Sequence, residues 1–200
     1  PEYDACLNLG GFANCSFEKE GQRIAYDICP VNIVLNSLAE TLHLPYDDRG
    51  KIARNGTIDI NLLDVLNTLQ YYKLNPPKSL GLEWVQQFIF PVLEKAKISA
   101  EDKIATFTEH VAVQLAAQFA EESSVLVTGR GAYNDYLLER VQYHKKLRLE
   151  VPSPQLIEYK EALVFGLLGV LRMRNEANCL ASVTGAKHDH CSGMLFQKLP

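Results

Sequence analysis

The sequence has few of the features that mark specialised classes of protein. Its five cysteines form no Cys-x-x-Cys pair, and an odd number of scattered thiols fits no closed disulfide framework. Reduced thiols are typical of the cytoplasm, so we expect a cytoplasmic protein. The chain opens on Pro-Glu-Tyr-Asp, without Met and without the basic start of a signal peptide, which suggests a trimmed or excised chain.

A basic excess and a long apolar run are both missing. Lys and Arg total 20 against 24 Asp and Glu, and the net charge of -4 predicts no nucleic-acid partner. The longest uncharged apolar run, residues 162–171, has ten residues, whereas a membrane-spanning helix needs about 20. We therefore expect no membrane partner.

The composition that remains is that of a folded domain. The 200 residues are 47% hydrophobic and 22% charged, which suffices for one good core and excludes disorder and collagen-like repeats. No repeat, low-complexity stretch or linker divides the chain. The composition therefore favours a single domain.

The apolar periodicity predicts three strands followed by helices. Strands are expected over residues 5–9, 12–17 and 23–28, which together make a β-meander. A helix begins near Val31 and ends at Leu44-Pro45, and a loop with a short helix covers residues 47–56. The rest alternates helix and strand: a helix capped by Asp59, one from Leu82 ending at Pro91, one over 104–120 begun by Ser99 and Asp102, a strand over 124–128, a helix over 133–142, a strand over 147–151 and a helix over 155–172. This order predicts an α/β fold with an inserted helical layer.

The first candidate site is the Gly10-Gly11 pair between two strands. Both glycines can take positive φ, and the amides of Asn8 and Asn14 can donate to phosphate oxygens. An ordinary hairpin turn accounts for the spacing as well, because Gly-Gly is a common turn pair. The residues alone favour the turn.

The second candidate site is Gly129-Arg130-Gly131, between a buried strand and a helix. Glycines there let a flat ligand lie against the backbone, and open α/β sheets bind ligands at the carboxyl ends of their strands. Asn134 follows at the start of the helix. A tight strand-to-helix turn is the alternative.

The remaining chemical groups are open to plainer interpretations. Lys78 follows two prolines and suits either a phosphate contact or a solvated loop. Glu109 and Glu161 lie on helix faces, where surface carboxylates and capping partners are common. The metal-capable residues 188–191 are adjacent on an extended segment, so we expect a solvated loop and no metal site. The apolar face of residues 162–171 suits packing on the sheet, or a homodimer interface helped by Gly166 and Gly169.

The two glycine turns together resemble one lobe of the actin, sugar-kinase and Hsp70-type ATPases, which have a ribonuclease H-like fold. Six strings narrow the resemblance to the anhydro-N-acetylmuramic acid kinase family, in that family's order and over nearly all 200 residues. They are residues 8–14 (NLGGFAN), 76–83 (PPKSLGLE), 105–109 (ATFTE), 129–134 (GRGAYN), 160–165 (KEALVF) and 183–186 (VTGA).

The resemblance implies an ATP- and Mg²⁺-dependent enzyme of cell-wall recycling. Such an enzyme opens the 1,6-anhydro ring of a small-molecule amino sugar with water and phosphorylates the freed O6. It implies that residues 1–200 are the C-terminal, nucleotide-binding lobe of a two-lobed kinase, whose absent N-terminal lobe is a partner and carries the catalytic Asp. No catalytic residue is then expected in this chain. The implied ATP-binding residues are Asn8, Gly10, Gly11, Asn14, Lys78, Gly129, Gly131 and Asn134, and Glu161 is the implied sugar contact.

The sequence also departs from the family pattern near these elements. The family's Asp-x-Gly-Pro-Gly-Asn is DICPVN at residues 27–32, so Cys29 and Val31 replace two glycines. Arg130 stands within a triple-glycine turn, and Leu82 stands where the family has Arg. These departures keep two alternatives open: a kinase of another anhydro or amino sugar, and a non-catalytic nucleotide-binding or dimerisation module.

Overall fold

A five-stranded mixed sheet forms the centre of the protein. The computed structural model describes residues 2–196. The strands lie in the order β3-β2-β1-β4-β5, and their bounds are β1 Ala5–Leu9, β2 Phe12–Lys19, β3 Gln22–Pro30, β4 Ser124–Thr128 and β5 Arg148–Glu150. The first three pair antiparallel, whereas β4 lies parallel to β1, and β5 lies parallel to β4. The predicted meander and the α/β class are confirmed.

Alternation along the strands separates the core from the polar face of the sheet. In β1, Leu7 and Leu9 are buried, whereas Asn8, which lies between them, is only half-buried. Leu7 is in register with Val127 of β4, and both belong to one core cluster with Phe107. Because side chains alternate between faces, Asn8 and its neighbour in register, Thr128, share the other face.

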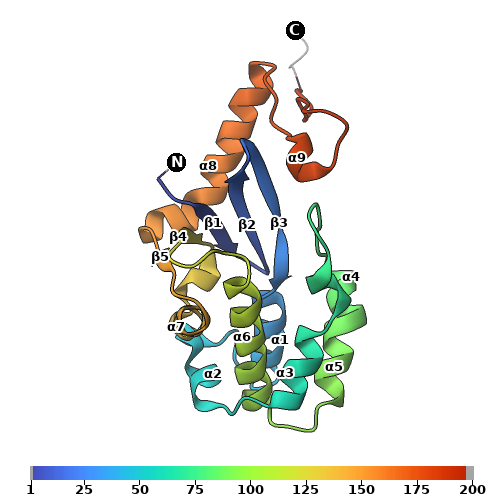
Figure 1. Ribbon diagram of the computed structural model, residues 1–200, viewed down its shortest axis with the longest axis vertical. Helices are drawn as coiled ribbons and strands as arrows, with labels where there is room; N and C mark the ends of the chain where they lie inside the picture. Colours follow the sequence, from blue (N-terminus) through green and yellow to red (C-terminus); the bar gives the residue numbers. More distant parts are fainter. Residues whose placement is uncertain (1, 197–200) are drawn as a thin grey trace.

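Most helices gather around α6, which is Ala100–Ala116. Figure 1 shows α1 to α7 packed together in the lower part of the molecule. Ser99 caps α6 by accepting the Asp102 N–H at 3.0 Å, and Asp59 caps α3 by accepting the Leu62 N–H at 2.8 Å, as the sequence predicts. The other helices of this group are α1 Asn32–Glu40, α2 Lys51–Asn55, α3 Ile60–Asn67 and α7 Asp135–His144, with short 3-10 turns at Asp48–Gly50, Gln70–Lys73 and Arg130–Tyr133.

The expected end of a helix at Pro91 is wrong. Helical backbone runs from α4 (Leu82–Trp84) through a π-helical stretch (Val85–Ile89) into α5 (Phe90–Lys95). A proline inside an α-helix lacks a donor and clashes with the carbonyl four residues earlier. The wider π turn immediately before Pro91 changes the hydrogen-bond register, so that Pro91 falls within the first turn of α5, where no donor is needed.

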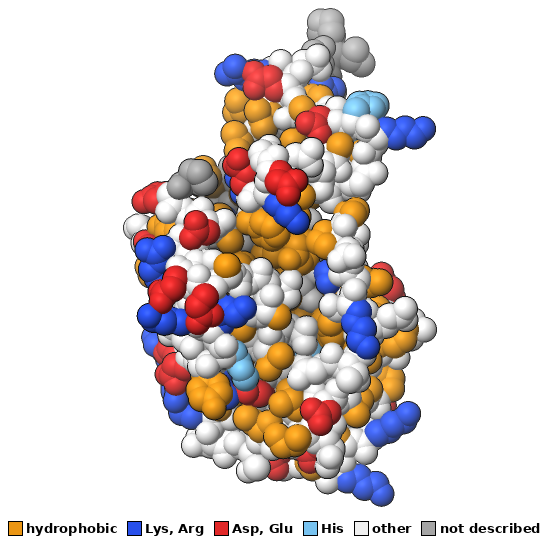
Figure 2. Space-filling model, in the orientation of Figure 1, with side chains coloured by type: hydrophobic (Ala, Val, Ile, Leu, Met, Phe, Trp, Pro, Cys, Tyr) orange, Lys and Arg blue, Asp and Glu red, His pale blue; other side chains and the backbone are white. Residues whose placement is uncertain are grey.

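The last long helix, α8 (Pro154–Met173), does not pack on the sheet along the predicted stretch. Ile157, near its start, is buried, whereas Leu163, Phe165 and Leu167 are 64%, 71% and 57% exposed. A Cβ on Gly166 or Gly169 would meet nothing within 4 Å. Figure 1 shows α8 continuing past the strands, and Figure 2 shows hydrophobic side chains exposed along its upper part. Sheet packing of residues 162–171 is therefore a wrong prediction.

The short helix α9 (Ala181–Thr184) follows and lies near β3. Among residues 2–196, no helix combines the length and the hydropathy that crossing a bilayer requires.

Candidate functional site

The sheet topology brings the two glycine turns together. Asn8 and Thr128 are register partners on the parallel strands β1 and β4, so Gly10-Gly11 and Gly129 leave the same edge of the sheet side by side. A cleft of about 1280 Å³ opens there. This is the carboxyl end of parallel strands, where α/β sheets bind ligands. Its lining includes Asn8, Gly10, Gly11, Glu40, Asp47, Arg49, Leu82, Gly129, Arg130, Gly131, Tyr133, Asn134, Glu158, Lys160 and Glu161.

The first turn is fixed to the start of α1 by its carbonyl groups. The Gly11 carbonyl accepts the Val31 N–H at 2.8 Å, and the Gly10 carbonyl accepts the Asn32 N–H at 3.3 Å. The Gly10 N–H donates to the Phe12 carbonyl at 3.1 Å. Neither glycine uses the positive φ that its residue type allows. The Gly10 N–H is therefore not free to bind an anion, and the side-chain amide of Asn8 becomes the more accessible donor.

The second turn needs its glycines for contact with the end of β1. Gly129 has a φ of 80°, and a Cβ on it would lie 2.6 Å from the Leu9 carbonyl oxygen. A Cβ on Gly131 would lie 2.7 Å from the Leu9 Cβ. Both positions exclude any larger residue, because the turn lies directly on the first strand. A structural reason for these glycines thus stands beside the ligand-binding one.

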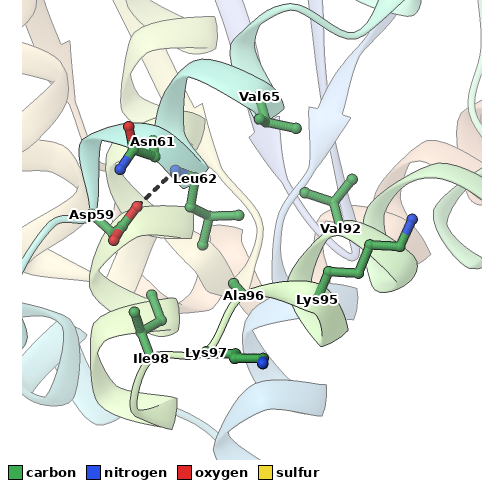
Figure 3. Close-up of a pocket in the computed structure, with 9 residues that line it drawn as sticks. All are labelled: Asp59, Asn61, Leu62, Val65, Val92, Lys95, Ala96, Lys97 and Ile98. Carbon is green, nitrogen blue, oxygen red and sulfur yellow. Dashed lines mark hydrogen bonds between the residues drawn. The ribbon is translucent and has the colours of Figure 1, made fainter.

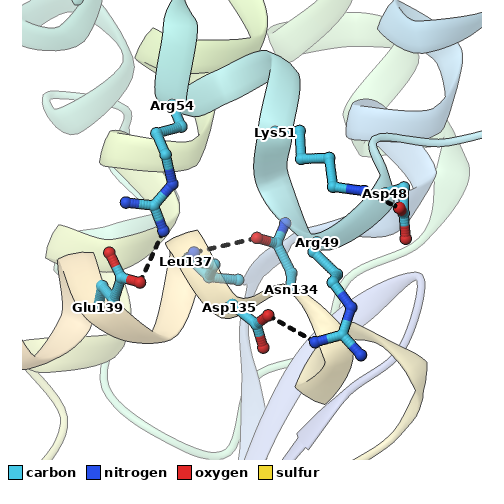
Figure 4. Close-up of polar contacts among 8 residues, drawn as sticks. All are labelled: Asp48, Arg49, Lys51, Arg54, Asn134, Asp135, Leu137 and Glu139. Carbon is cyan, nitrogen blue, oxygen red and sulfur yellow. Dashed lines mark hydrogen bonds and ion pairs between the residues drawn. The ribbon is translucent and has the colours of Figure 1, made fainter.

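Asn134 is the N-cap of α7 as well as part of the cleft wall. Its Oδ1 accepts the Leu137 N–H at 3.0 Å, and it lies against Gly50, where a Cβ would be 2.3 Å from that oxygen. Figure 4 shows the ion pairs that join α7 to residues 48–55, which are distant in the chain. They are Arg49 with Asp135 at 2.8 Å and Arg54 with Glu139 at 2.6 Å. These contacts hold the wall of the cleft in place.

Sequence reasoning missed Lys160 as a member of this site. Its Nζ donates to Asn8 Oδ1 and, at 3.1 Å, to Thr128 Oγ1. Burial lowers the pKa of the ammonium from its ordinary value. Glu161, the next residue, is exposed to the cleft. The available signal was the family string over residues 160–165, which includes Lys160 beside Glu161, but nothing local links Lys160 to a residue as distant in the chain as Asn8.

Two predicted ATP contacts lie outside the cleft lining. Lys78 stands beside the Tyr26 and Tyr71 rings, with its Nζ 5.5 Å and 4.7 Å from their centroids. Asn14 is the register partner of Asn8 on β2 and does not reach the cleft surface. The geometry gives neither residue a route to a ligand in this cleft. Their binding roles stay predictions.

The departures from the family pattern divide into buried and exposed positions. Cys29 and Val31 are fully buried in the core, and burial raises the pKa of the Cys29 thiol above its ordinary value. Arg130 has an 82% exposed side chain and pairs with Glu158 at 3.4 Å on the rim of the cleft. Leu82 also lines the cleft. The first two therefore alter packing beneath the first turn, whereas the other two alter the surface that a ligand meets.

A second cavity, of about 400 Å³, lies between α3 and α5 (Figure 3). Its walls are mostly apolar, with Leu62, Val65, Val92 and Ile98 facing it, and the Asp59 carboxylate beside it is occupied as a helix cap. It offers no reactive pair of groups. The chemistry of the molecule is concentrated at the glycine turns.

The other candidate carboxylate and the histidine segment have structural surroundings. Glu109 is buried and accepts two bonds from Arg140, at 2.6 and 2.7 Å, and contacts His144 at 2.7 Å. His190 forms an isolated bridge with Cys179, and within residues 2–196 no group of three His, Cys, Asp or Glu side chains is placed to hold a metal ion. Glu109 therefore joins α6 to α7.

Sequence comparison relates the chain to one family of known proteins. The profile of the anhydro-N-acetylmuramic acid kinase family matches residues 1–198. The chain is 31% identical over 207 aligned positions to the kinase of that name from Saccharophagus degradans, covering 96% of this chain and 55% of the relative. It is 32% identical to the one from Burkholderia orbicola, covering 96% and 54%.

One solved structure shows the same fold. It is component A of the (R)-2-hydroxyglutaryl-CoA dehydratase of Acidaminococcus fermentans, with a TM-score of 0.50 and 18% identity over 82% of this chain and 60% of that one. With the strand order, this likeness confirms the ribonuclease H-like, actin-like ATPase fold. The chain spans about half the length of the curated relatives it matches. On the match over residues 1–198, the chain belongs to the anhydro-N-acetylmuramic acid kinase family.

Proposed function

We propose that this chain is the nucleotide-binding lobe of an ATP-dependent kinase that opens the 1,6-anhydro ring of anhydro-N-acetylmuramic acid and phosphorylates the freed O6. The observation that carries the proposal is the meeting of the two glycine turns at the carboxyl ends of β1 and β4, in a chain of this family. Phosphoryl transfer depends mainly on positioning and charge neutralisation, and a cleft of about 1280 Å³ can hold a nucleotide.

The proposed roles are divided between the residues that line the cleft. Asn8, Gly10 and Gly11 are the proposed phosphate contacts, whereas Gly129, Gly131 and Asn134 are the proposed adenosine contacts, and all six line the cleft. Glu161, which lies on α8 and also lines the cleft, is the proposed sugar contact. The positions of Asn14 and Lys78 do not support direct contact with the nucleotide.

The cleft also fits Mg²⁺ carried by the nucleotide. Of its carboxylates, Asp47 accepts the Ile52 and Ala53 N–H groups, and Asp48 and Glu158 pair with Lys51 and Arg130. Glu40 and Glu161 also line it. Mg²⁺ in phosphoryl-transfer sites uses phosphates, water and one or two carboxylates, so no larger protein cage is required. Bound there, the ion would neutralise phosphate charge.

We propose that the exposed apolar part of α8, which includes Leu163, Phe165 and Leu167, contacts the N-terminal lobe of a longer protein. The relatives are nearly twice as long as the matched segment, and this part of α8 follows directly on the residues of α8 that line the cleft. An exposed patch of this kind is typical of an interface. The other lobe then closes the cleft and supplies the catalytic base, and a homodimer is the competing occupant. Cytoplasmic localisation, absence of a nucleic-acid or membrane partner, and the choice between this sugar and another amino sugar stay predictions.

Calorimetry on this chain tests the proposal. We expect ATP with Mg²⁺ to bind, and the chain alone to leave the anhydro sugar unphosphorylated. Gly11→Asp should weaken ATP binding by placing a carboxylate beside the phosphates, whereas the neutral isostere Gly11→Asn should weaken it less, because a Cβ at Gly11 meets nothing nearer than 3.8 Å. Absence of ATP binding would favour a non-catalytic module. Turnover by this chain alone would place the base within it.

A further inference from the structure

Lys160 links the residues that precede both glycine turns. Asn8 lies two residues before Gly10, and Thr128 lies directly before Gly129. Lys160 reaches both from α8, so three segments far apart in the chain meet at one ammonium group. That group lies in the lining of the cleft.

No carboxylate is in ion-pair contact with this ammonium in the described part of the chain, and the charge of the neighbouring Glu161 acts on it only at longer range. Among residues 2–196, no carboxylate forms an ion pair with Lys160, whereas Lys51 and Lys146 pair with Asp48 and Glu122. Its two acceptors are a neutral amide oxygen and a neutral hydroxyl. A half-buried charge with no opposite charge in contact gains stability when an anion completes the site.

The bonding pattern leaves one N–H donor of the ammonium available for that anion. An ammonium has three N–H donors and no acceptor, and two of the donors are used on Asn8 and Thr128. Because Lys160 can only donate, the Asn8 amide must turn its oxygen to the lysine and its nitrogen toward the first turn. The Asn8 Nδ2 accordingly lies on the side of Gly10, 3.5 Å from where a Gly10 Cβ would be. Lysine and amide together present N–H groups at the junction of the two turns.

We propose that Lys160 binds the phosphate chain of the nucleotide and orients the Asn8 amide to bind it as well. This inference rests on the proposed function, because it takes the ligand of the cleft to be a nucleotide. The required chemistry is that of a polyphosphate, whose several negative oxygens can accept from both groups at once. Lys160 is thus both a binding residue and the positioning residue for Asn8.

The test compares ATP with adenosine, which lacks phosphates, by calorimetry on this chain. Lys160→Met should weaken ATP binding by about 10-fold or more, the value of a charge-assisted hydrogen bond, and change adenosine binding less than about twofold. Lys160→Gln, which keeps a donor for Asn8 but loses the charge, is the second variant if Lys160→Met does not fold. It should also lower ATP affinity selectively, whereas Lys160→Arg should preserve most of it.

Lys145→Met is the matched control, because Lys145 is also half-buried and donates to a neutral acceptor, the Phe119 carbonyl, away from the cleft. Equal ATP affinity in Lys160→Gln and Lys145→Met, with intact binding by the parent chain, overturns the inference and leaves the proposed function standing. The inference is also overturned if the Lys160 variants keep their affinity for ATP and instead lose affinity for an anionic sugar. Failure of the parent chain to bind either ATP or adenosine overturns both proposals.

Discussion

Gly129 and Leu9 lie so close that a side chain on the glycine would begin 2.6 Å from the Leu9 carbonyl oxygen. This contact joins the second glycine turn to the end of the first strand. It means that the two turns of the cleft form one packed unit, and that a change in one can move the other.

Alanine substitutions in the second glycine turn should destabilise the protein more than alanine substitutions in the first. Gly129→Ala and Gly131→Ala should each lower the free energy of unfolding by about 1–3 kcal/mol, because the added Cβ overlaps Leu9 and, at Gly129, positive φ is strained as well. Gly10→Ala and Gly11→Ala should change it by less than about 1 kcal/mol, since their nearest contacts are 3.4 and 3.8 Å. Urea unfolding measures all four. Equal losses in the two turns would show that the first turn is as tightly packed as the second.

Two threonines on α6 should respond in opposite ways to replacement by valine. Both are fully buried, but among the described residues Thr108 Oγ1 has no hydrogen-bond partner. Thr106 Oγ1 donates to the Asp102 carbonyl at 2.7 Å and accepts the Asp59 N–H at 2.9 Å. Thr108→Val should leave stability unchanged or raise it, whereas Thr106→Val should cost about 1–3 kcal/mol. Thermal unfolding of the pair provides the comparison, and a large loss in Thr108→Val would reveal a bonded hydroxyl.

Acid should destabilise the protein through His110 before it affects Glu109. Burial lowers the pKa of His110 to about 3 from 6.5, and the ring is held neutral between Asn67 Oδ1 and the Tyr72 hydroxyl. A depressed folded-state pKa contributes stability above the unfolded value and loses it below, so this contribution declines as the pH falls from 6.5 toward 3. The steepest loss is about 1.4 kcal/mol per pH unit.

Glu109 adds a second decline at lower pH. Burial alone would raise its pKa, but hydrogen bonds from Arg140 and His144 outweigh that effect and lower it from 4.5. Its contribution is therefore present above 4.5 and lost as the pH falls through its folded-state pKa.

The His110 prediction is tested by urea unfolding from pH 7 to 4. The free energy of unfolding should fall less steeply with pH in His110→Gln than in the parent, with exposed His188→Gln as the control. Equal slopes in His110→Gln and the parent would show that a group other than His110 causes the loss of stability.

Charge on the exposed face of α8 should leave the fold intact. The double substitution Leu163→Asp, Leu167→Asp should change the free energy of unfolding by less than about 1 kcal/mol, because both side chains are already exposed. Ile157→Asp on the same helix is the buried control and should cost several kcal/mol. In the longer protein, the double substitution should weaken contact between the lobes and reduce activity. Full activity there would contradict the proposed interface.

Sequence alone predicted the elements whose signals are local. The caps at Asp59 and Ser99 bond to N–H groups three residues away, and the strand Ser124–Thr128 forms at the short run of strand-compatible residues that predicted it. The six family strings located the two turns and gave the cleft its candidate residues. The predicted caps and strand are confirmed, because a short stretch of chain contains the interacting groups, whereas the binding roles of the candidate residues stay predictions.

Only the tertiary structure decided what depends on distant contacts. Lys160 meets Asn8 across 152 positions, Gly129 needs its conformation because Leu9 lies beneath it, and the sheet ends before it can cover the exposed half of α8. No periodicity or spacing in the sequence predicts these contacts, because they depend on how the strands and α8 are arranged in three dimensions. Sequence therefore determined which segments form the site, and tertiary packing determined which of their side chains face each other.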